Sequence, residues 1–219
     1  NSFQPKKDFF FFFKIKSTCI YNPLDIKKIK RLSKEKVPKI FQKNKLKIIN
    51  IGRLSEEKDH MTLLKALCLL KKQISYKAVI MGRGNLENKI KKFIKENNLN
   101  KDVKLINYKS NPYPYIKQSD FLILTSLHEG LPNVLLEASV LKKFAISSNC
   151  ISGPKEILSN GKGGALFKVG NYKELAKLII FYNKNLNARN KKINFASKNI
   201  HRFDYKKNLN SYLNVITNN

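Results

Sequence analysis

The chain has 219 residues, of which 44 are Lys or Arg and 15 are Asp or Glu, so its formal net charge is +29. This length allows one α/β domain with a sizeable core and leaves little room for two full domains. Three widely spaced cysteines argue against a disulfide framework or a zinc site, and no apolar run reaches the roughly 20 residues that span a bilayer.

The positive charge would attract polyanions such as nucleic acid, anionic lipid head groups or phosphorylated substrates. Only five of the 44 cations are Arg, and an excess of Lys, Asn and Ile is also what AT-rich codons produce. Specific nucleic-acid readers use Arg more heavily, so we rank nucleic acid below an anionic membrane surface. A non-catalytic basic module that binds nucleic acid or membrane stays open as the alternative function. We see no secretion signal and expect a cytoplasmic protein, with peripheral association at the inner face of the cell membrane as an option.

Residues 1–25 differ from the rest, because they contain five consecutive Phe in a strongly β-prone stretch. After a Lys-rich connector, 26–44, short apolar runs alternate with amphipathic segments. Strands are expected at 45–52, 76–82, 101–107, 120–126, 142–148 and 163–169. Helices are expected at 59–72, 85–98, as a short turn within 111–120, from Pro132 onward, and at 153–160, 171–184, 187–200 and 204–216, with Asp59 and Asp204 as N-caps. This alternation predicts an α/β fold with a Rossmann-like parallel sheet and helices on both faces.

Four of the expected strands run into loops that begin with a small residue: Gly52, Gly82, Ser126 and Ser148. In an open parallel sheet, ligands bind beyond the carboxyl ends of the strands. We therefore expect a site at this edge.

The first of these loops carries two cations, Arg53 and Lys58, after Gly52 and near the start of the next helix. Such cations and free helix amides favour a phosphate. The motif "MGRGN" around Gly82 falls short of a full glycine fingerprint and is interpreted as a tight turn, with Gly82 as a position where backbone and ligand could approach closely.

The segment "EGLPNVLLE" places Glu129 before Gly130 and Pro132, and Glu137 one and a half turns into the helix that Pro132 should begin. Free amides at this helix start would bind an anion. Two carboxylates around an anion site suit a nucleotide sugar, with Glu129 on the sugar and Glu137 on the ribose. The amides concerned belong to Leu131, Asn133 and Val134.

The sequence resembles the carboxyl-terminal half of family-4 retaining glycosyltransferases, which have the GT-B fold. Matching segments run in order over nearly the whole chain, and "EGLPNVLLE" matches the family's E-x7-E signature. The other matching segments are "IYNPLD", "NIGRLSEEKD", "VIMGRGNLENKI", "SGPKEIL" and "GGALFKVGN".

The resemblance implies that Arg53 and Lys58 hold the donor diphosphate, that Glu129 contacts the transferred sugar and that Glu137 binds the ribose. Ile106 and Asn107 would face the base, beside a loop with Tyr108, Tyr113 and Tyr115. It further implies a UDP-sugar as donor and a cell-envelope glycan or lipid-linked acceptor, as in lipopolysaccharide or capsule biosynthesis. No metal or other cofactor is expected.

The family's other half is an amino-terminal acceptor domain, which the residues before 25 are too few to form. The chain is therefore expected to be an excised half or a remnant, nearly inactive alone. Residues 1–25 would be linker from the missing domain, 26–200 the Rossmann-like nucleotide-sugar-binding domain, and 201–219 a helix that crosses to the other domain.

Overall fold

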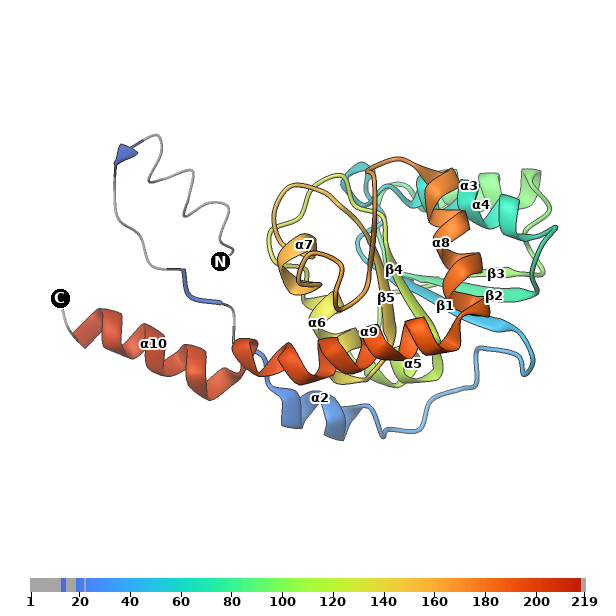
Figure 1. The fold of residues 1–219 in the computed structure, drawn as a ribbon. Coiled ribbons are helices and arrows are strands. Elements are labelled where there is room, and N and C mark those ends of the chain that lie inside the picture. The colour runs from blue at the N-terminus through green and yellow to red at the C-terminus, as the bar shows by residue number, and fades with distance from the viewer. Residues whose placement is uncertain (1–12, 15–18, 22, 218–219) are drawn as a thin grey trace.

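The computed structural model describes residues 13–14, 19–21 and 23–217, so most of the Phe-rich segment lies outside the described residues. Six parallel strands form one sheet in the order β3-β2-β1-β4-β5-β6 (Figure 1). All six predicted strands are confirmed, with ends that differ from the prediction by at most two residues. The strands are β1 (Leu46–Ile51), β2 (Tyr76–Met81), β3 (Val103–Ile106), β4 (Phe121–Leu124), β5 (Phe144–Ser148) and β6 (Ala165–Phe167).

Helices cover both faces of the sheet, as predicted (Figure 1). Neighbouring strand residues point to opposite faces: Ile48 belongs to one buried cluster and Ile49 to the other. The first cluster receives α3 (His60–Leu70), α4 (Glu87–Glu96) and α8 (Tyr172–Lys184), and the second receives α2 (Ile26–Leu32), α5 (Tyr113–Gln118), α6 (Asn133–Val140) and α7 (Pro154–Ile157). The helix α9 (Leu186–Asn199) packs against α6, α8 and β5.

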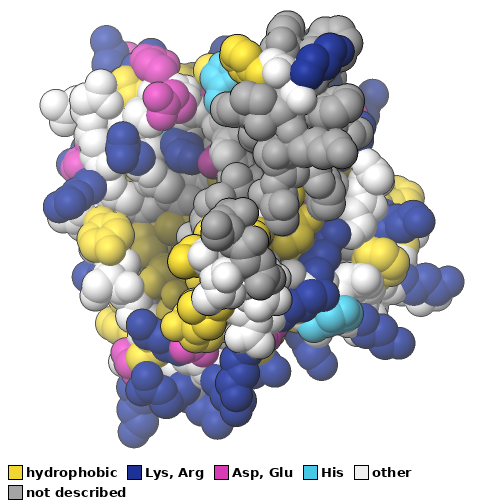
Figure 2. All heavy atoms as spheres, turned by 90° about the vertical axis from the view of Figure 1, so that its left-hand side faces the viewer, with side chains coloured by type: hydrophobic (Ala, Val, Ile, Leu, Met, Phe, Trp, Pro, Cys, Tyr) yellow, Lys and Arg dark blue, Asp and Glu magenta, His cyan; other side chains and the backbone are white. Residues whose placement is uncertain are grey.

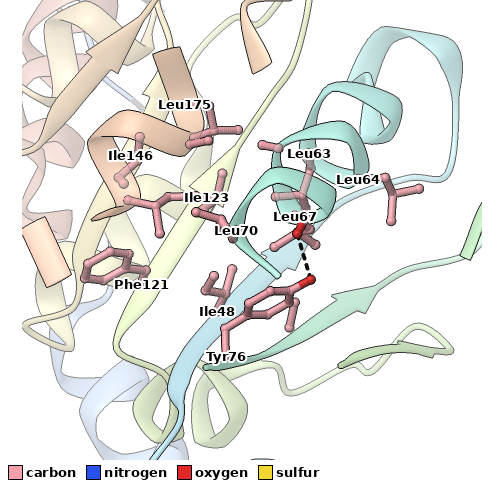
Figure 3. Packing of buried hydrophobic residues seen from close by; sticks show 14 of the residues in the cluster. Ile48, Leu63, Leu64, Leu67, Leu70, Tyr76, Phe121, Ile123, Ile146 and Leu175 are labelled. Carbon is pink, nitrogen blue, oxygen red and sulfur yellow. Dashed lines mark hydrogen bonds between the residues drawn. The ribbon is translucent and has the colours of Figure 1, made fainter. Parts of the chain in front are cut away.

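Figure 3 shows the first cluster, where α3 and α8 meet the sheet. The hydroxyl of Tyr76 in β2 donates a 2.9 Å hydrogen bond to the carbonyl oxygen of Leu67 in α3. Burial of each large aliphatic side chain in this cluster contributes about 1.5–3 kcal/mol relative to exposure. The core therefore holds the sheet and α3 rigidly together, and the loop between β1 and α3 is fixed at both ends.

Three local predictions are wrong. Residues 26–44 are not a plain connector, because Asp25 caps the helix α2 by accepting a 2.8 Å hydrogen bond from the Lys28 amide. The helix α6 begins at Asn133, with Pro132 at its N-cap in extended conformation. Tyr113 and Tyr115 do not lie in a loop, since both belong to α5 and pack in the second cluster.

The chain ends in η2 (Ile200–Phe203) and α10 (Tyr205–Thr217), which extends away from the sheet (Figure 1). Asp204 caps α10 as predicted, because its Oδ1 accepts from the Lys206 amide at 3.0 Å. Leu24 lies beside this junction, where its amide donates to the carbonyl of Phe203. No helix in the described part of the chain is both long and apolar enough to cross a membrane.

Candidate functional site

The strand order places a topological switch between β1 and β4. From β1 the chain continues outward to β2 and β3, whereas β4 lies on the opposite side of β1 and leads to β5 and β6. At such a point the loops that follow the two central strands diverge and leave a crevice for ligands. The predicted cationic loop follows β1 and the predicted "EGLP" loop follows β4, so both lie at this switch. Figure 2 views the molecule from the side at which the strands end; Lys and Arg side chains are scattered over this view and gather most densely at its lower edge.

The loop after β1 begins with Gly52 and carries the two cations Arg53 and Lys58. A Cβ atom at Gly52 would lie 3.6 Å from the Cγ and Cδ atoms of Lys58, so the stem of Lys58 packs over the bare backbone of Gly52. Arg53 is exposed. The loop continues through η1 (Glu56–Lys58).

The start of α3 is closed to anions. Asp59 caps it from a left-handed conformation and accepts hydrogen bonds from the amide and the hydroxyl of Thr62, at 3.1 and 2.6 Å. A carboxylate already satisfies the amide that sequence analysis expected to assist a phosphate here. In this loop the side chains of Arg53 and Lys58, rather than helix amides, provide the attraction for an anion.

His60, next to Lys58, is buried, and its two ring nitrogens have no hydrogen-bond partner among the described residues. Burial, with a smaller effect of the Lys58 charge, lowers the pKa of His60 to about 4. The imidazole is therefore neutral at neutral pH and adds no charge beside Lys58.

The loops after β1 and β4 are joined by direct contacts. The Nζ atom of Lys58 lies 2.5 Å from Oε1 of Glu129, and the side chain of Glu129 is only 9% exposed. The Thr125 hydroxyl donates to the carbonyl of Lys58 at 2.9 Å, and the Leu127 amide donates to the carbonyl of Glu57 at 2.8 Å. The two segments that sequence analysis assigned to one site therefore do converge.

The start of α6 is open to anions. No side chain caps it, and the structure shows no hydrogen bond from the amides of Leu131, Asn133 or Val134 to any residue that it describes. These amides lie at the positive end of the helix dipole. The helix begins one residue later than predicted, but the predicted anion-binding amides remain.

Glu137 lies in α6 against Tyr113 of α5. Burial raises the pKa of Glu137 to about 7, and a hydrogen bond with the Tyr113 hydroxyl partly opposes this rise. The same environment raises the pKa of Tyr113, mainly through burial. The structure shows no direct contact between Glu137 and the Lys58–Glu129 pair within the described chain.

The loop after β2 packs against the loop after β1. A Cβ atom at Gly82 would lie 1.9 Å from the carbonyl oxygen of Gly52, so Gly82 marks a close approach between two backbone segments. The Gly82 amide donates to the carbonyl of Ile106 at 3.1 Å, which places Ile106 and Asn107 beside this loop. The exposed ring of Tyr108 lies 5.5 Å from the Arg83 guanidinium.

Sequence reasoning placed the loop after β5 at the expected edge, through Ser148, but assigned none of its residues to the site. The hydroxyl of Ser152 donates to the carbonyls of Glu129 and Gly130, at 3.2 and 3.3 Å. A Cβ atom at Gly153 would lie 2.0 Å from the Gly130 oxygen, so this loop supports the "EGLP" segment from behind. A cavity of about 780 Å³ opens on its far side, lined by Asn149, Ser152, Lys155 and Arg202 among others. Arg53, Lys58 and Glu129 do not line that cavity.

In sequence and in fold the chain is similar to known glycosyltransferases. The model of the family "Glycosyl transferases group 1" matches residues 33–199. An uncharacterized glycosyltransferase of Methanocaldococcus jannaschii is 36% identical over 149 residues, which cover 66% of this chain and 37% of that protein. In Campylobacter jejuni, N-acetylgalactosamine-N,N'-diacetylbacillosaminyl-diphospho-undecaprenol 4-alpha-N-acetylgalactosaminyltransferase is 33% identical over 156 residues, or 71% of this chain and 41% of that protein.

Among solved structures, a mutant of Staphylococcus aureus TarM in complex with fondaparinux, alpha-GlcNAc-glycerol and UDP superposes with a TM-score of 0.80 at 25% identity. The superposition covers 95% of this chain and 41% of TarM. The chain thus spans well under two thirds of the length of these relatives.

Proposed function

This chain belongs to the group 1 glycosyl transferases, and from that premise we propose that it is the donor-binding half of a retaining enzyme. The enzyme would transfer a sugar from a UDP-sugar to a cell-envelope glycan or a lipid-linked acceptor. The observation that carries this proposal is the contact between Lys58 and Glu129, because it brings a cation and a sugar-binding acid to the switch point of the sheet.

The donor diphosphate would lie between the cationic loop after β1 and the free amides at the start of α6. Arg53 offers a bidentate guanidinium, and Lys58 can still donate two protons while it contacts Glu129. The amides of Leu131, Asn133 and Val134 add donors that need no reorganisation. Gly52 leaves room for the stem of Lys58, Gly82 lets the backbone of Gly52 approach closely, and a Cβ at Gly130 would meet nothing within 4 Å among the described residues. Pro132 fixes the approach to the helix.

The ends of the donor would contact the two carboxylates. Glu129 would accept hydrogen bonds from the transferred sugar, and Glu137 from the ribose hydroxyls. Ile106 and Asn107, at the end of β3, would face the base.

In the reaction, the bond between the anomeric carbon of the sugar and the β-phosphate oxygen breaks, and UDP gains negative charge as it leaves. Arg53, Lys58 and the α6 amides would stabilise that charge. The new bond to the acceptor oxygen would form with retention of configuration, and the acceptor hydroxyl proton would pass to the leaving β-phosphate oxygen of UDP. Electrostatic stabilisation of the leaving group, rather than a general base on this chain, is the contribution that these residues would make.

Relatives support the donor and acceptor classes. The C. jejuni relative is named for N-acetylgalactosaminyl transfer to a diphospho-undecaprenol glycan, and the TarM structure contains UDP. Because the matched relatives are much longer than this chain, we propose that a separate amino-terminal domain binds the acceptor. In this proposal residues 1–25 are linker, 26–200 form the donor domain and 201–219 cross to the partner domain. The charge of +29 would favour a cytoplasmic location at an anionic membrane surface.

Titration calorimetry with UDP tests the proposal. We expect UDP to bind the chain, and Arg53→Ala to weaken binding by about tenfold, as loss of a charge-assisted contact predicts. The alternative, a non-catalytic polyanion module, would bind heparin or DNA with steep salt dependence and would be indifferent to Glu129→Gln. An absence of UDP binding at millimolar concentration would reject the proposed function.

A further inference from the structure

Ser126 contacts Glu129 from within the fold. Its side chain is fully buried just after β4, and its hydroxyl donates a 2.6 Å hydrogen bond to Oε1 of Glu129. Ser148, at the end of β5, donates from its own hydroxyl to the carbonyl of Ser126 at 2.6 Å. Ser126 is therefore held by the sheet and in turn holds the carboxylate.

Ser126 and Lys58 donate to the same oxygen atom. Lys58 lies 2.5 Å and Ser126 2.6 Å from Oε1, while no hydrogen bond to Oε2 from any described residue is seen. Two donors on one oxygen fix the rotation of the carboxylate. A carboxylate oxygen has two lone pairs, and Lys58 and Ser126 occupy both of those on Oε1. Oε2 therefore remains the acceptor for a ligand hydroxyl.

A bound nucleotide sugar would affect the hydrogen bonds of Lys58 and Ser126 differently. Lys58 is 25% exposed on a flexible four-carbon stem, and a diphosphate would compete for its ammonium. The Ser126 hydroxyl is attached through a single carbon and is buried. Lys58 would share its protons between Glu129 and the diphosphate, whereas the Ser126 hydroxyl donates to Glu129 alone among the described residues.

We propose that Ser126 is a positioning residue for the transferred sugar, because it orients Glu129 so that Oε2 faces a sugar hydroxyl. This inference rests on the proposed function, in which Glu129 contacts the sugar. Ser126 itself does not touch the substrate, and its effect should be confined to the part of affinity that depends on the sugar.

The test compares affinities for UDP and for UDP-N-acetylglucosamine, UDP-N-acetylgalactosamine and UDP-glucose by calorimetry, in wild type and in Ser126→Ala. For a sugar that the wild type binds, the ratio of Kd for UDP-sugar to Kd for UDP should rise about tenfold in the variant, since one hydrogen bond to a charged group is lost. The Kd for UDP itself should change less than twofold.

Ser147→Ala is the matched control. Ser147 is equally buried in β5 and its hydroxyl contacts only the neighbouring Ser148 carbonyl, at 3.1 Å, in the described structure. This variant should leave the ratio unchanged. Ser126→Cys retains the shape and a weak donor and should raise the ratio less than alanine does. If Ser126→Ala unfolds at the assay temperature, the cysteine variant provides the same comparison.

The outcomes separate the two proposals. No binding of UDP or any UDP-sugar to wild type would overturn the proposed function. UDP binding with an unchanged ratio in Ser126→Ala, or an equal loss of affinity for UDP and UDP-sugar, would overturn the positioning role alone.

Discussion

Lys58 and Glu129 are 71 residues apart in sequence, yet the Lys58 ammonium contacts the Glu129 carboxylate at 2.5 Å. The pair is partly buried, with side chains 25% and 9% exposed. It connects the loops on either side of the switch between β1 and β4, and the proposed donor site is built around it.

Removal of the cation should destabilise the fold. Lys58→Met leaves Glu129 with only the Ser126 donor in a poorly hydrated position, and we expect a loss of about 1–2 kcal/mol in the free energy of unfolding. Urea denaturation measures it. Lys91→Met is the matched control, because Lys91 pairs with Glu87 on an exposed helix surface, where such pairs contribute roughly 0.5 kcal/mol or less. Equal losses of unfolding free energy in the two variants would show that the Lys58–Glu129 pair stabilises the fold no more than an exposed ion pair does.

Two glycines of the site should respond differently to alanine. A methyl group at Gly82 would lie 1.9 Å from the Gly52 oxygen, so Gly82→Ala must separate two backbone segments and should cost roughly 3 kcal/mol or more. A methyl group at Gly130 meets nothing within 4 Å, so Gly130→Ala should change stability by less than about 0.5 kcal/mol. Thermal unfolding of both variants measures the difference, and similar melting temperatures would contradict the close packing of these loops.

Stability should depend on pH through Glu137. Burial raises its folded-state pKa from 4.5 to about 7. The folded protein therefore binds this proton more tightly, and the resulting stability is present in full below pH 4.5 and is lost as pH rises through 7. A shift of this size corresponds to about 3 kcal/mol at most, reduced by whatever water reaches the carboxylate.

Glu137→Gln tests that dependence. Relative to wild type, its free energy of unfolding should increase between pH 5 and pH 8, because the amide has no charge to desolvate. Glu96→Gln, at an exposed position on α4, reports the general effect of removing one negative charge. A stability difference between wild type and Glu137→Gln that stays flat with pH would contradict the raised pKa.

Sequence patterns predicted the layout of this fold because each signal was local. Six apolar runs became six strands, and the caps at Asp59 and Asp204 formed as expected. The helix α2 was missed because only Ile29 of its seven residues is fully buried, which leaves almost no hydrophobic period in a Lys-rich segment.

The sequence predicted which loops form the candidate site, but not the side-chain contacts that hold these loops in place. The order of strands brings Lys58 and Glu129 together by topology alone, so their convergence could be inferred. The contacts of Ser126, Ser152 and Tyr113 depend on side-chain positions across different loops. No spacing in the sequence signals them, although small hydroxyl residues after two adjacent strands were visible at Ser126 and Ser148.

The most direct test of the account is a crystal structure of the chain soaked with a UDP-sugar that it binds. We predict density for the diphosphate between Arg53, Lys58 and the α6 amides, with a sugar hydroxyl within hydrogen-bond distance of Oε2 of Glu129. Density for the nucleotide in the cavity lined by Asn149 and Arg202, with the Lys58–Glu129 surface empty, would contradict it.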